Sequence, residues 1–359
     1  MKIAFINGRQ ALPLFQGGDG VSMHTLLSFL SRRGHLVDCI GKVNPHRRAI
    51  PLSEVREQLH AQGMIITRTS EEHVEYTLSD HYHGKMYLFD AFHRELRQEL
   101  VSSQPDSVLT QLEDSHEVIR VASELNYPVL HFVHDTHPLN MRALQLSKLM
   151  AFVLFNSHFT AARYSKVLQC PSDVLYPPID RQQCQAHERL PRYITFINPV
   201  ARKGVSLAEA LIKAFPREAF LLVPGWEPVE LDVSAYSNVM LLDRHVPSSM
   251  SQVYAQTTVL LVPSQYEETF GRVAAEALVN GIPVMASHVG GLPEAVGPGG
   301  WLVGDFTQRF AWIDLLADVL AQPEEQAARG ARGQIYAQQF HADAVFQQFE
   351  EILQYVCRC

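Results

Sequence analysis

Short apolar runs alternate with helical patterns along this chain, and this alternation restricts the fold more than any other feature. Strand-like runs occupy residues 2–6, 36–40, 129–133 and 151–155, and a pattern of helical period fills residues 21–33. Parallel strands need long crossover connections, usually helices, so this order is typical of strand–helix–strand units in a parallel sheet. The first half of the chain is therefore predicted to be an α/β domain.

A second series of strands and helices begins after the proline pair Pro177-Pro178. Two prolines stop regular structure, and the polar residues 181–192 that follow are interpreted as a linker. Strand-like runs then return at 193–197, 219–223, 239–242, 259–262 and 283–286, and the pattern is helical from about residue 305 to the end, with interruptions at Gly330 and Gly333. Because 359 residues exceed the usual size of one hydrophobic core, we expect two doubly wound domains that meet at a cleft.

Composition argues against several classes of protein. The net charge of −8 gives no support for nucleic-acid binding, and hydrophobic residues make up an ordinary 47%. The five cysteines are odd in number and scattered, which suits reduced cytoplasmic thiols rather than a disulfide framework. The chain opens on a strand-like run, and no stretch approaches the about 18 apolar residues of a membrane span. We expect a cytoplasmic protein and leave peripheral membrane contact open.

The segment from Pro263 to Ala277 carries the clearest functional pattern. It follows a buried strand-like run and holds two carboxylates, Glu268 and Glu276, on either side of a Phe-Gly pair. Ligands of open α/β sheets bind outside the carboxyl ends of the strands, where this segment is expected to lie. The two glutamates suit either an acid/base pair for glycoside chemistry or two contacts to hydroxyl groups of one ligand.

Two other turns are candidates for contact with an anion. Arg202 and Lys203 follow the first strand of the second series and precede Gly204 and a helical run, a place where cations suit a diphosphate. Gly17 and Gly18 lie between the first strand and the first helix, where the backbone can approach a ligand closely. Neither turn is a GxGxxG motif, so a plain surface turn is the alternative for each.

His134 follows the apolar run at residues 129–133 and precedes Asp135. A single histidine is more often structural than catalytic, but a position at the end of a strand makes His134 a candidate site residue. No HExxH pair or close His/Cys cluster collects the 17 histidines into a recognisable metal site. We therefore expect neither a bound metal nor an organic cofactor.

Together these motifs resemble the retaining glycosyltransferase family 4, which has the GT-B fold. The strongest matches are Glu268, Phe270-Gly271, Glu276-Ala277, Gly281-Ile282-Pro283-Val284 and Gly290-Gly291-Leu292-Pro293-Glu294. Supporting matches are Gly17-Gly18, Arg33-Gly34-His35, His134-Asp135, Asn156-Ser157, Pro177-Pro178-Ile179-Asp180 and Lys203-Gly204. The resemblance extends over nearly the whole chain.

The resemblance implies two Rossmann-like domains that face each other across a cleft. Residues 1–185 would form an N-terminal acceptor-binding domain, and residues 186–335 a C-terminal domain that binds a nucleotide-sugar. Residues 336–359, with apolar side chains at helical spacing, would form a helix that crosses back to the first domain. The irregular region 70–95, rich in His, Tyr, Asp and Glu, is either an acceptor-facing loop or, as we favour, a solvated excursion.

The same resemblance assigns the donor-binding residues. Glu276 would hold the ribose hydroxyls, and Lys203, with Arg202, would neutralise the diphosphate. Gly17 and Gly18 would lie near the distal phosphate.

Contact with the donor sugar is assigned in the same way. Glu268 and the backbone of Thr269, Phe270 and Gly271 would contact this sugar, and His134 would reach it from the first domain. His134 and Glu268 are thus the predicted catalytic residues.

The family pattern is broken at one point. Many members carry a Gly-Arg pair where this chain has Ile197-Asn198, which removes a phosphate-binding arginine from its usual place. Arg202 is then the expected substitute.

The implied activity is transfer of a sugar from a UDP-, GDP- or ADP-linked donor to a sugar, lipid-linked or small-molecule acceptor. For this family a front-face attack with retention is proposed, in which the leaving phosphate takes the acceptor proton, and this agrees with the lack of an obvious nucleophile. The chain has no Asp-x-Asp motif, which fits a metal-independent enzyme. The alternatives are a nucleotide-sugar-binding scaffold without transferase activity and a nucleotide-sugar epimerase.

Overall fold

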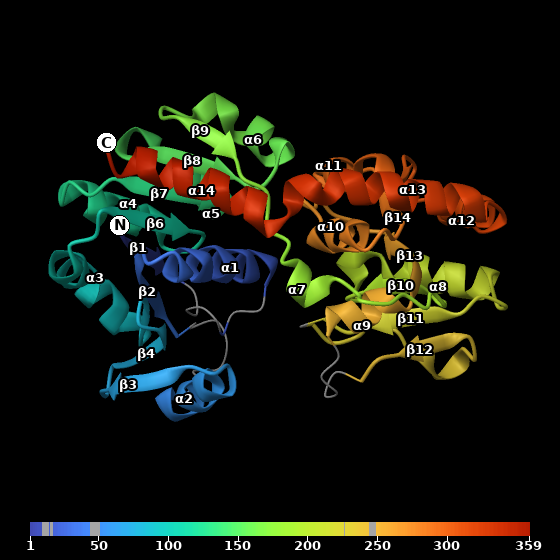
Figure 1. Cartoon of the computed structure of the whole chain (residues 1–359), viewed down its shortest axis with the longest axis horizontal. Coiled ribbons are helices and arrows are strands. Elements are labelled where there is room, and N and C mark those ends of the chain that lie inside the picture. Colours follow the sequence, from blue (N-terminus) through green and yellow to red (C-terminus); the bar gives the residue numbers. More distant parts are fainter. Residues whose placement is uncertain (9–13, 15–16, 44–50, 226, 244–248) are drawn as a thin grey trace. The chain divides into compact units, whose positions relative to one another are not determined.

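The structure, a computed structural model, describes residues 1–8, 14, 17–43, 51–225, 227–243 and 249–359 (Figure 1). The chain forms two compact units, one of Met1–Pro178 together with Val345–Cys359 and the other of Ile179–Ala344. Each unit contains one sheet with helices packed on it (Figure 1). The boundaries at Pro178 and Ala344 differ by several residues from those expected at residues 185 and 335.

In its described residues, the N-terminal unit contains a nine-stranded sheet with the order β3-β4-β5-β2-β1-β6-β7-β8-β9. The strands are β1 (Lys2–Asn7), β2 (Leu36–Lys42), β3 (Ile65–Thr69), β4 (His73–Ser79), β5 (Tyr82–Tyr87), β6 (Ser107–Gln111), β7 (Val129–Val133), β8 (Phe152–Phe155) and β9 (Ser172–Val174). The helices are α1 (Gly18–Arg32), α2 (Leu52–Ala61), α3 (Phe89–Ser103), α4 (Ser115–Glu124), α5 (Pro138–Leu144), η1 (Ser147–Leu149), α6 (His158–Tyr164), η2 (Ser165–Val167) and most of α14 (Ala342–Val356). The strand order changes direction between β1 and β6, and ligands of such sheets bind at the carboxyl edge of this switch point.

Strands β4 and β5 show that the expectation for residues 70–95 was wrong. Strand β4 pairs antiparallel with both β3 and β5, so the sheet is mixed, and α3 begins before residue 95. Val74 and Tyr76 are buried, while Glu75 and Thr77 next to them are partly exposed. This alternation of period two is typical of a half-buried strand, and the high content of polar residues concealed it.

In its described residues, the C-terminal unit contains a six-stranded sheet with the order β12-β11-β10-β13-β14-β15, in which every recorded pair is parallel. The strands are β10 (Tyr193–Ile197), β11 (Phe220–Val223), β12 (Val239–Leu241), β13 (Thr257–Val262), β14 (Val284–Ser287) and β15 (Gly300–Val303). The helices are α7 (Arg181–Cys184), η3 (Ala201–Lys203), α8 (Val205–Ala214), η4 (Val233–Ala235), α9 (Met250–Ala255), α10 (Arg272–Val279), α11 (Leu292–Val296), η5 (Gly297–Gly299), α12 (Arg309–Ala321), α13 (Pro323–Tyr336) and η6 (Ala337–Phe340). The switch point of this sheet lies between β10 and β13.

Residues 181–192 pack on the C-terminal unit and are not the free linker that their polarity indicated. Arg189 donates hydrogen bonds to the carbonyl oxygens of Thr257 at 2.6 Å and Asn280 at 3.1 Å. The side chain of Asn280 in turn accepts a hydrogen bond from the Ala186 backbone at 2.8 Å. The polar side chains of this segment therefore satisfy backbone groups of the unit.

The end of the chain packs on the N-terminal unit through α14 (Figure 1). Phe346 stacks on Phe29 of α1 with ring centroids 4.0 Å apart, and Glu350 lies 3.0 Å from His35. The buried apolar residues of α14 are Val345, Phe346, Phe349, Ile352, Leu353 and Val356. This crossing helix agrees with the predicted fold, although it begins at Ala342 rather than at residue 336.

Among the described residues, no helix has both the length and the apolar run that a membrane span requires.

Gly330 and Gly333 lie inside α13 and do not interrupt it, contrary to expectation. The break falls instead at Gln322, between α12 and α13. A Cβ atom on Gly330 would lie 2.2 Å from the Gly281 carbonyl oxygen, and one on Gly333 would lie 2.9 Å from the Gly299 Cα atom. Glycine is present because α13 lies directly against neighbouring backbone.

We expect Gly330→Ala to destabilise the protein, although alanine is the better helix former by about 1 kcal/mol. The added methyl group would displace the Gly281 backbone, and overpacking of this kind costs about 1–3 kcal/mol. The midpoint of thermal unfolding should therefore fall. Gly304→Ala is the control, because a Cβ atom there has no neighbour within 4 Å. An equal fall in both variants would contradict the packing explanation.

Candidate functional site

The switch point of the C-terminal sheet brings together two predicted site residues, Lys203 and Glu268. Strands β10 and β13 are parallel neighbours, so the loops that follow them leave the same edge. Lys203 Nζ lies 2.5 Å from Glu268 Oε1, which also accepts a hydrogen bond from Ser264 Oγ at 2.5 Å. Glu268 is 8% exposed and Ser264 is fully buried, so the ion pair is fixed within the edge of the sheet.

Lys203 keeps its charge despite its surroundings. Burial by itself would lower the pKa of Lys203, but the Glu268 carboxylate and the Tyr266 hydroxyl raise it above its usual value. Lys203 Nζ also lies 5.1 Å from the centroid of the Tyr266 ring, within the range of a cation–π interaction. Lys203 is therefore protonated at neutral pH and forms an ion pair with Glu268.

Close backbone contact holds the two loops together. Gly204 has a left-handed φ of 87°, and a Cβ atom there would lie 2.0 Å from the Pro263 carbonyl oxygen. Gln265 N donates to the Arg202 carbonyl oxygen at 2.9 Å. Asn198, where the family pattern has arginine, has a φ of 59°, a conformation that asparagine adopts more readily than most residues. The departure from the family pattern thus falls on a tight turn.

Arg202 is not part of the Lys203–Glu268 pair. Its guanidinium group binds the Glu227 carboxylate, with Nε 3.1 Å from Oε1 and a second hydrogen bond from Nη2. Its Cζ atom lies 5.5 Å from the centroid of the Tyr266 ring, which Lys203 also contacts. Contact between Arg202 and a diphosphate would therefore require it to leave or share Glu227.

Glu276 is held by two side chains that the sequence analysis did not assign to the site. Its Oε1 atom accepts a hydrogen bond from Arg272 Nε at 2.7 Å, and Oε2 accepts one from the Tyr254 hydroxyl at 2.8 Å. Burial first, and then the Glu276 charge, raise the pKa of Tyr254 well above its usual value, so this hydroxyl remains a donor. The i, i+4 spacing of Arg272 and Glu276 was visible in the sequence, whereas Tyr254 comes from a separate helix, α9.

The turn at Thr269, Phe270 and Gly271 leads into α10, with Gly271 as its N-cap. Phe270 is 2% exposed, and its ring meets Phe340 edge to face at 5.1 Å, so this side chain belongs to the core. The Glu268 carbonyl oxygen accepts a hydrogen bond from Gly291 N at 2.6 Å, which fixes the start of the turn. Ligand contact through Phe270 would thus use its backbone.

The remaining predicted site residues belong to the N-terminal unit. Gly17 is the N-cap of α1 and Gly18 its first residue, and a Cβ atom on Gly18 would have no neighbour within 4 Å. His134 follows β7, is 6% exposed and packs on the Phe132 ring with centroids 3.9 Å apart. Asn156 Nδ2 donates to the His134 carbonyl oxygen at 2.8 Å, which holds the backbone of His134 in place.

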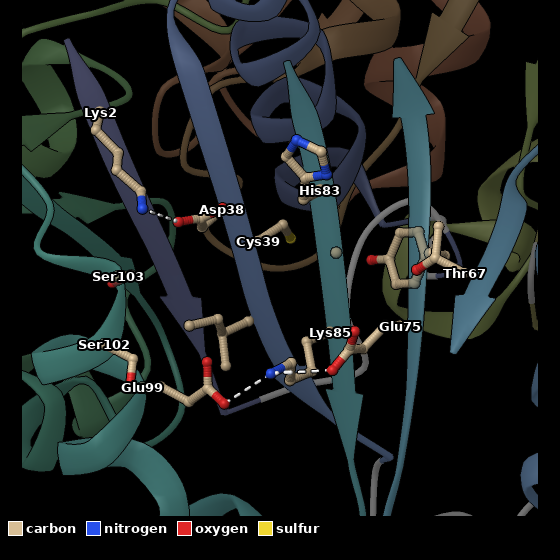
Figure 2. A pocket seen from close by; sticks show the side chains of 13 residues that line it. Lys2, Asp38, Cys39, Thr67, Glu75, His83, Lys85, Glu99, Ser102 and Ser103 are labelled. Atoms are coloured by element: carbon tan, nitrogen blue, oxygen red, sulfur yellow. Dashed lines mark hydrogen bonds and ion pairs between the residues drawn. The ribbon is translucent and has the colours of Figure 1, made fainter. Parts of the chain in front are cut away.

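A cavity of about 260 Å³ in the N-terminal unit contains none of the predicted site residues (Figure 2). Lys85 lies 3.2 Å from Glu75 and 2.8 Å from Glu99, and Lys2 lies 3.4 Å from Asp38. Figure 2 shows these pairs along the face of strands rather than at their carboxyl ends. Because ligands of such sheets bind at the carboxyl ends of the strands, we place the functional site elsewhere.

The geometry of the C-terminal edge suits a ligand that combines negative charge with hydroxyl groups. Lys203 and the start of α10 favour an anion, because the N-terminus of a helix carries partial positive charge. Glu268 and Glu276 are acceptors for hydroxyl donors, each oriented by other side chains. A nucleoside diphosphate linked to a sugar has both properties.

Comparison with known protein families finds similarity in part of the C-terminal unit. Residues 233–335, which include Glu268 and Glu276, match the family model described as glycosyl transferases group 1. The D-inositol 3-phosphate glycosyltransferase of Gordonia bronchialis is 38% identical over 114 residues, which cover 31% of this chain and 24% of that protein. The chain thus spans about a quarter of the length of this curated relative, and the similarity is confined to that part.

Solved structures match over almost the whole chain. Sucrose-phosphate synthase from Thermosynechococcus elongatus has a TM-score of 0.71 at 18% identity, covering 98% of each chain. Anabaena HepE in complex with UDP-glucose has a TM-score of 0.71 at 16% identity, covering 99% of each chain. These similarities confirm the predicted GT-B fold.

Lys203→Met should lower the free energy of unfolding by about 1–3 kcal/mol, because it leaves the Glu268 carboxylate buried beside Ser264 without its counter-charge. We expect less than for a fully buried pair, since the Lys203 side chain is 20% exposed. Adding Glu268→Gln should recover part of the loss in denaturant unfolding. Lys213→Met is the matched control, because Lys213 is 59% exposed and pairs with Glu209 on the surface. Additive effects of Lys203→Met and Glu268→Gln would argue against the coupling.

Proposed function

We propose that the protein is a glycosyltransferase that takes a sugar from a nucleotide-sugar and transfers it with retention, without a bound metal ion. The observation that carries this proposal is the Lys203–Glu268 pair at the switch point of the C-terminal sheet, beside the start of α10. The match of residues 233–335 to the group 1 glycosyl transferases supports it, as do the names of the curated relatives. The HepE neighbour, solved with UDP-glucose, has the same fold.

Lys203 is assigned to the diphosphate. Transfer breaks the bond from the anomeric carbon to a diphosphate oxygen and forms a bond from that carbon to an acceptor oxygen. Negative charge grows on the departing diphosphate, and a positive charge that is already in place stabilises the transition state without reorganisation. In a front-face reaction the departing diphosphate also receives the acceptor proton, so no protein nucleophile is required.

Glu276 is assigned to the ribose hydroxyls. Arg272 and Tyr254 each donate to one of its oxygens, so the carboxylate is oriented before a ligand arrives. Each carboxylate oxygen has a further lone pair, which a ribose hydroxyl can use. Arg272 and Tyr254 are therefore positioning residues, and preorganisation of this kind reduces the entropy lost on binding.

Glu268 and His134 are assigned to the donor sugar, Glu268 from the C-terminal unit and His134 from the N-terminal unit. Glu268 is held by Lys203 and Ser264, which orient it as an acceptor for a sugar hydroxyl. Gly17 and Gly18, at the start of α1, are assigned to the distal phosphate.

The backbone of the turn from Thr269 to Gly271 completes the donor-sugar contacts, since the Phe270 side chain is buried. Arg202 contributes less than Lys203 to neutralising the diphosphate in this assignment, because its guanidinium group is paired with Glu227.

The ribose assignment predicts a specific loss of affinity. Wild-type protein should bind one of UDP, GDP or ADP with a clear rise in melting temperature, and Glu276→Gln should weaken that binding about 10-fold, or 1.4 kcal/mol. The 2′,3′-dideoxy form of the same nucleotide should bind wild type and Glu276→Gln about equally, because the lost hydroxyls are the partners of Glu276. Glu325→Gln on α13 is the control. If Glu276→Gln also weakened binding of the dideoxy nucleotide 10-fold, the assignment of Glu276 to the ribose hydroxyls would be contradicted.

Turnover tests the reaction itself. Purified protein given UDP-, GDP- and ADP-sugars should slowly release one nucleoside diphosphate in water, and the rate should survive EDTA but fall at least 10-fold in Lys203→Ala. Lys213→Ala, on an exposed pair, should leave the rate unchanged. With an acceptor supplied, NMR of the glycoside product should show the donor's anomeric configuration. Binding without release would indicate a scaffold, conversion of the donor to its epimer would indicate an epimerase, and an inverted product would contradict retention.

A further inference from the structure

One stretch of the N-terminal unit contains no acidic residue. Between Thr136 and Ser172 the sequence has four lysines and arginines and no aspartate or glutamate, although the whole chain has 38 acidic residues and 30 basic ones. The four cations, all exposed, are Arg142, Lys148, Arg163 and Lys166. Positive charge is therefore concentrated in one part of a chain that is acidic as a whole.

These four cations lie toward the amino edge of the N-terminal sheet, opposite its carboxyl edge. Strands β7, β8 and β9 are parallel neighbours, so α5 with η1 and α6 with η2 each lead the chain back to the start of the next strand. Each cation is in the last turn of its helix, which is the part closest to that start. Together the four cations form a basic edge.

A hydrogen-bonded contact joins the two halves of the basic edge. The Ser147 hydroxyl accepts a hydrogen bond from Gln169 N at 3.1 Å and donates one to the Val167 carbonyl oxygen at 3.5 Å. Ser147 precedes Lys148 and Val167 follows Lys166, so adjoining turns carry the two lysines. Helices α5 and α6 also pack on one buried core cluster, so the four cations share one face of the sheet.

Acidic side chains do not neutralise the basic edge. Arg142, Lys148 and Lys166 form no ion pair among the residues that the structure describes. The residues outside that part include no aspartate or glutamate, so they add no acid that could pair with these cations. On α3, by contrast, Arg94 and Arg97 each pair with a glutamate. The charge of the basic edge is therefore available to an external partner.

The helix dipole accounts for only half of this charge pattern. A cation in the last turn of a helix is favourable for the dipole, and the same dipole favours an acid in the first turn. Helices α3 and α4 each have an acid in the first turn, whereas α5 and α6 have none. The dipole therefore explains why cations are present and not why acids are missing.

The chemistry of the basic edge fits an anionic membrane surface. Leu149 follows Lys148 and Val167 follows Lys166, and both apolar side chains are partly exposed where they pack on the core. Cations beside apolar side chains suit the boundary between lipid headgroups and acyl chains. A planar membrane touches one edge of a protein, so the excess of acids elsewhere in the chain does not face it. Nucleic acid is disfavoured, because the chain has a net charge of −8.

We infer that the basic edge docks peripherally on a membrane that contains anionic lipids. Its lysines and arginines contact the lipid phosphates, and the carboxyl edge at the other end of the strands stays accessible. Each cation that contacts an anionic membrane strengthens binding about 5-fold. This inference does not depend on the proposed function, since it uses neither the donor nor the reaction.

Vesicle co-sedimentation of the full-length protein tests the docking surface. The protein should bind mixed phosphatidylcholine–phosphatidylglycerol vesicles at low salt, more weakly as salt is added, and should not bind pure phosphatidylcholine. The double variant Lys148→Gln/Lys166→Gln should bind the mixed vesicles about 10-fold more weakly or worse. Arg94→Gln/Arg97→Gln is the matched control, because it removes two exposed cations that already have acidic partners.

A conservative variant separates charge from folding. Lys148→Arg/Lys166→Arg keeps both charges and should bind the mixed vesicles within about twofold of wild type. Equal losses in the two glutamine variants would show that net charge alone matters and would overturn the inference. Equal binding to pure phosphatidylcholine, no binding to the mixed vesicles at low salt, or binding of duplex DNA that Lys148→Gln/Lys166→Gln abolishes would overturn it as well. None of these results would bear on nucleotide-sugar binding, which the nucleotide titrations test separately.

Discussion

The ion pair between Lys203 and Glu268 is the interaction on which the arrangement of the C-terminal edge depends. It joins the loops that follow β10 and β13, the two strands that flank the switch point of the sheet. A lysine this close to a buried carboxylate stays charged, because each ion compensates for the burial of the other. Without that compensation, the edge would hold either an uncharged amine or an isolated carboxylate. Neither group would supply a positive charge to an anionic ligand such as a diphosphate.

The surrounding contacts fix the orientation of this pair and of its neighbour Glu276. Gly204 allows the loop after β10 to contact the backbone at Pro263. Arg272 and Tyr254 each donate a hydrogen bond to one carboxylate oxygen of Glu276. Lys203, Glu268 and Glu276 are therefore each held by at least one other residue of the unit. Such preorganisation favours a transition state in which charge moves onto a departing phosphate.

The carboxyl edges of the two sheets share one topology and differ in chemistry. The C-terminal edge presents the charged Lys203 near a helix start, whereas the N-terminal edge covers Lys42 and presents the carboxylates of Asp114 and Glu117.

The periodicity of the sequence by itself determined the α/β class and the two series of strands, because periodicity is a local property. The GT-B fold was implied by the resemblance of the ordered motifs to a known family. The sequence also placed Lys203, Glu268 and Glu276 after strands, because parallel strands end at one edge. The sequence analysis was wrong for residues 70–95, where polar residues conceal the alternation of half-buried strands. It was also wrong for residues 181–192 and for the helix through Gly330, where Arg189 and the glycines contact distant backbone. Only the tertiary structure could decide that Tyr254 orients Glu276 and that Lys42, His93, Asp114 and Glu117 meet, because these partners come from separate elements and no spacing along the chain encodes their distances.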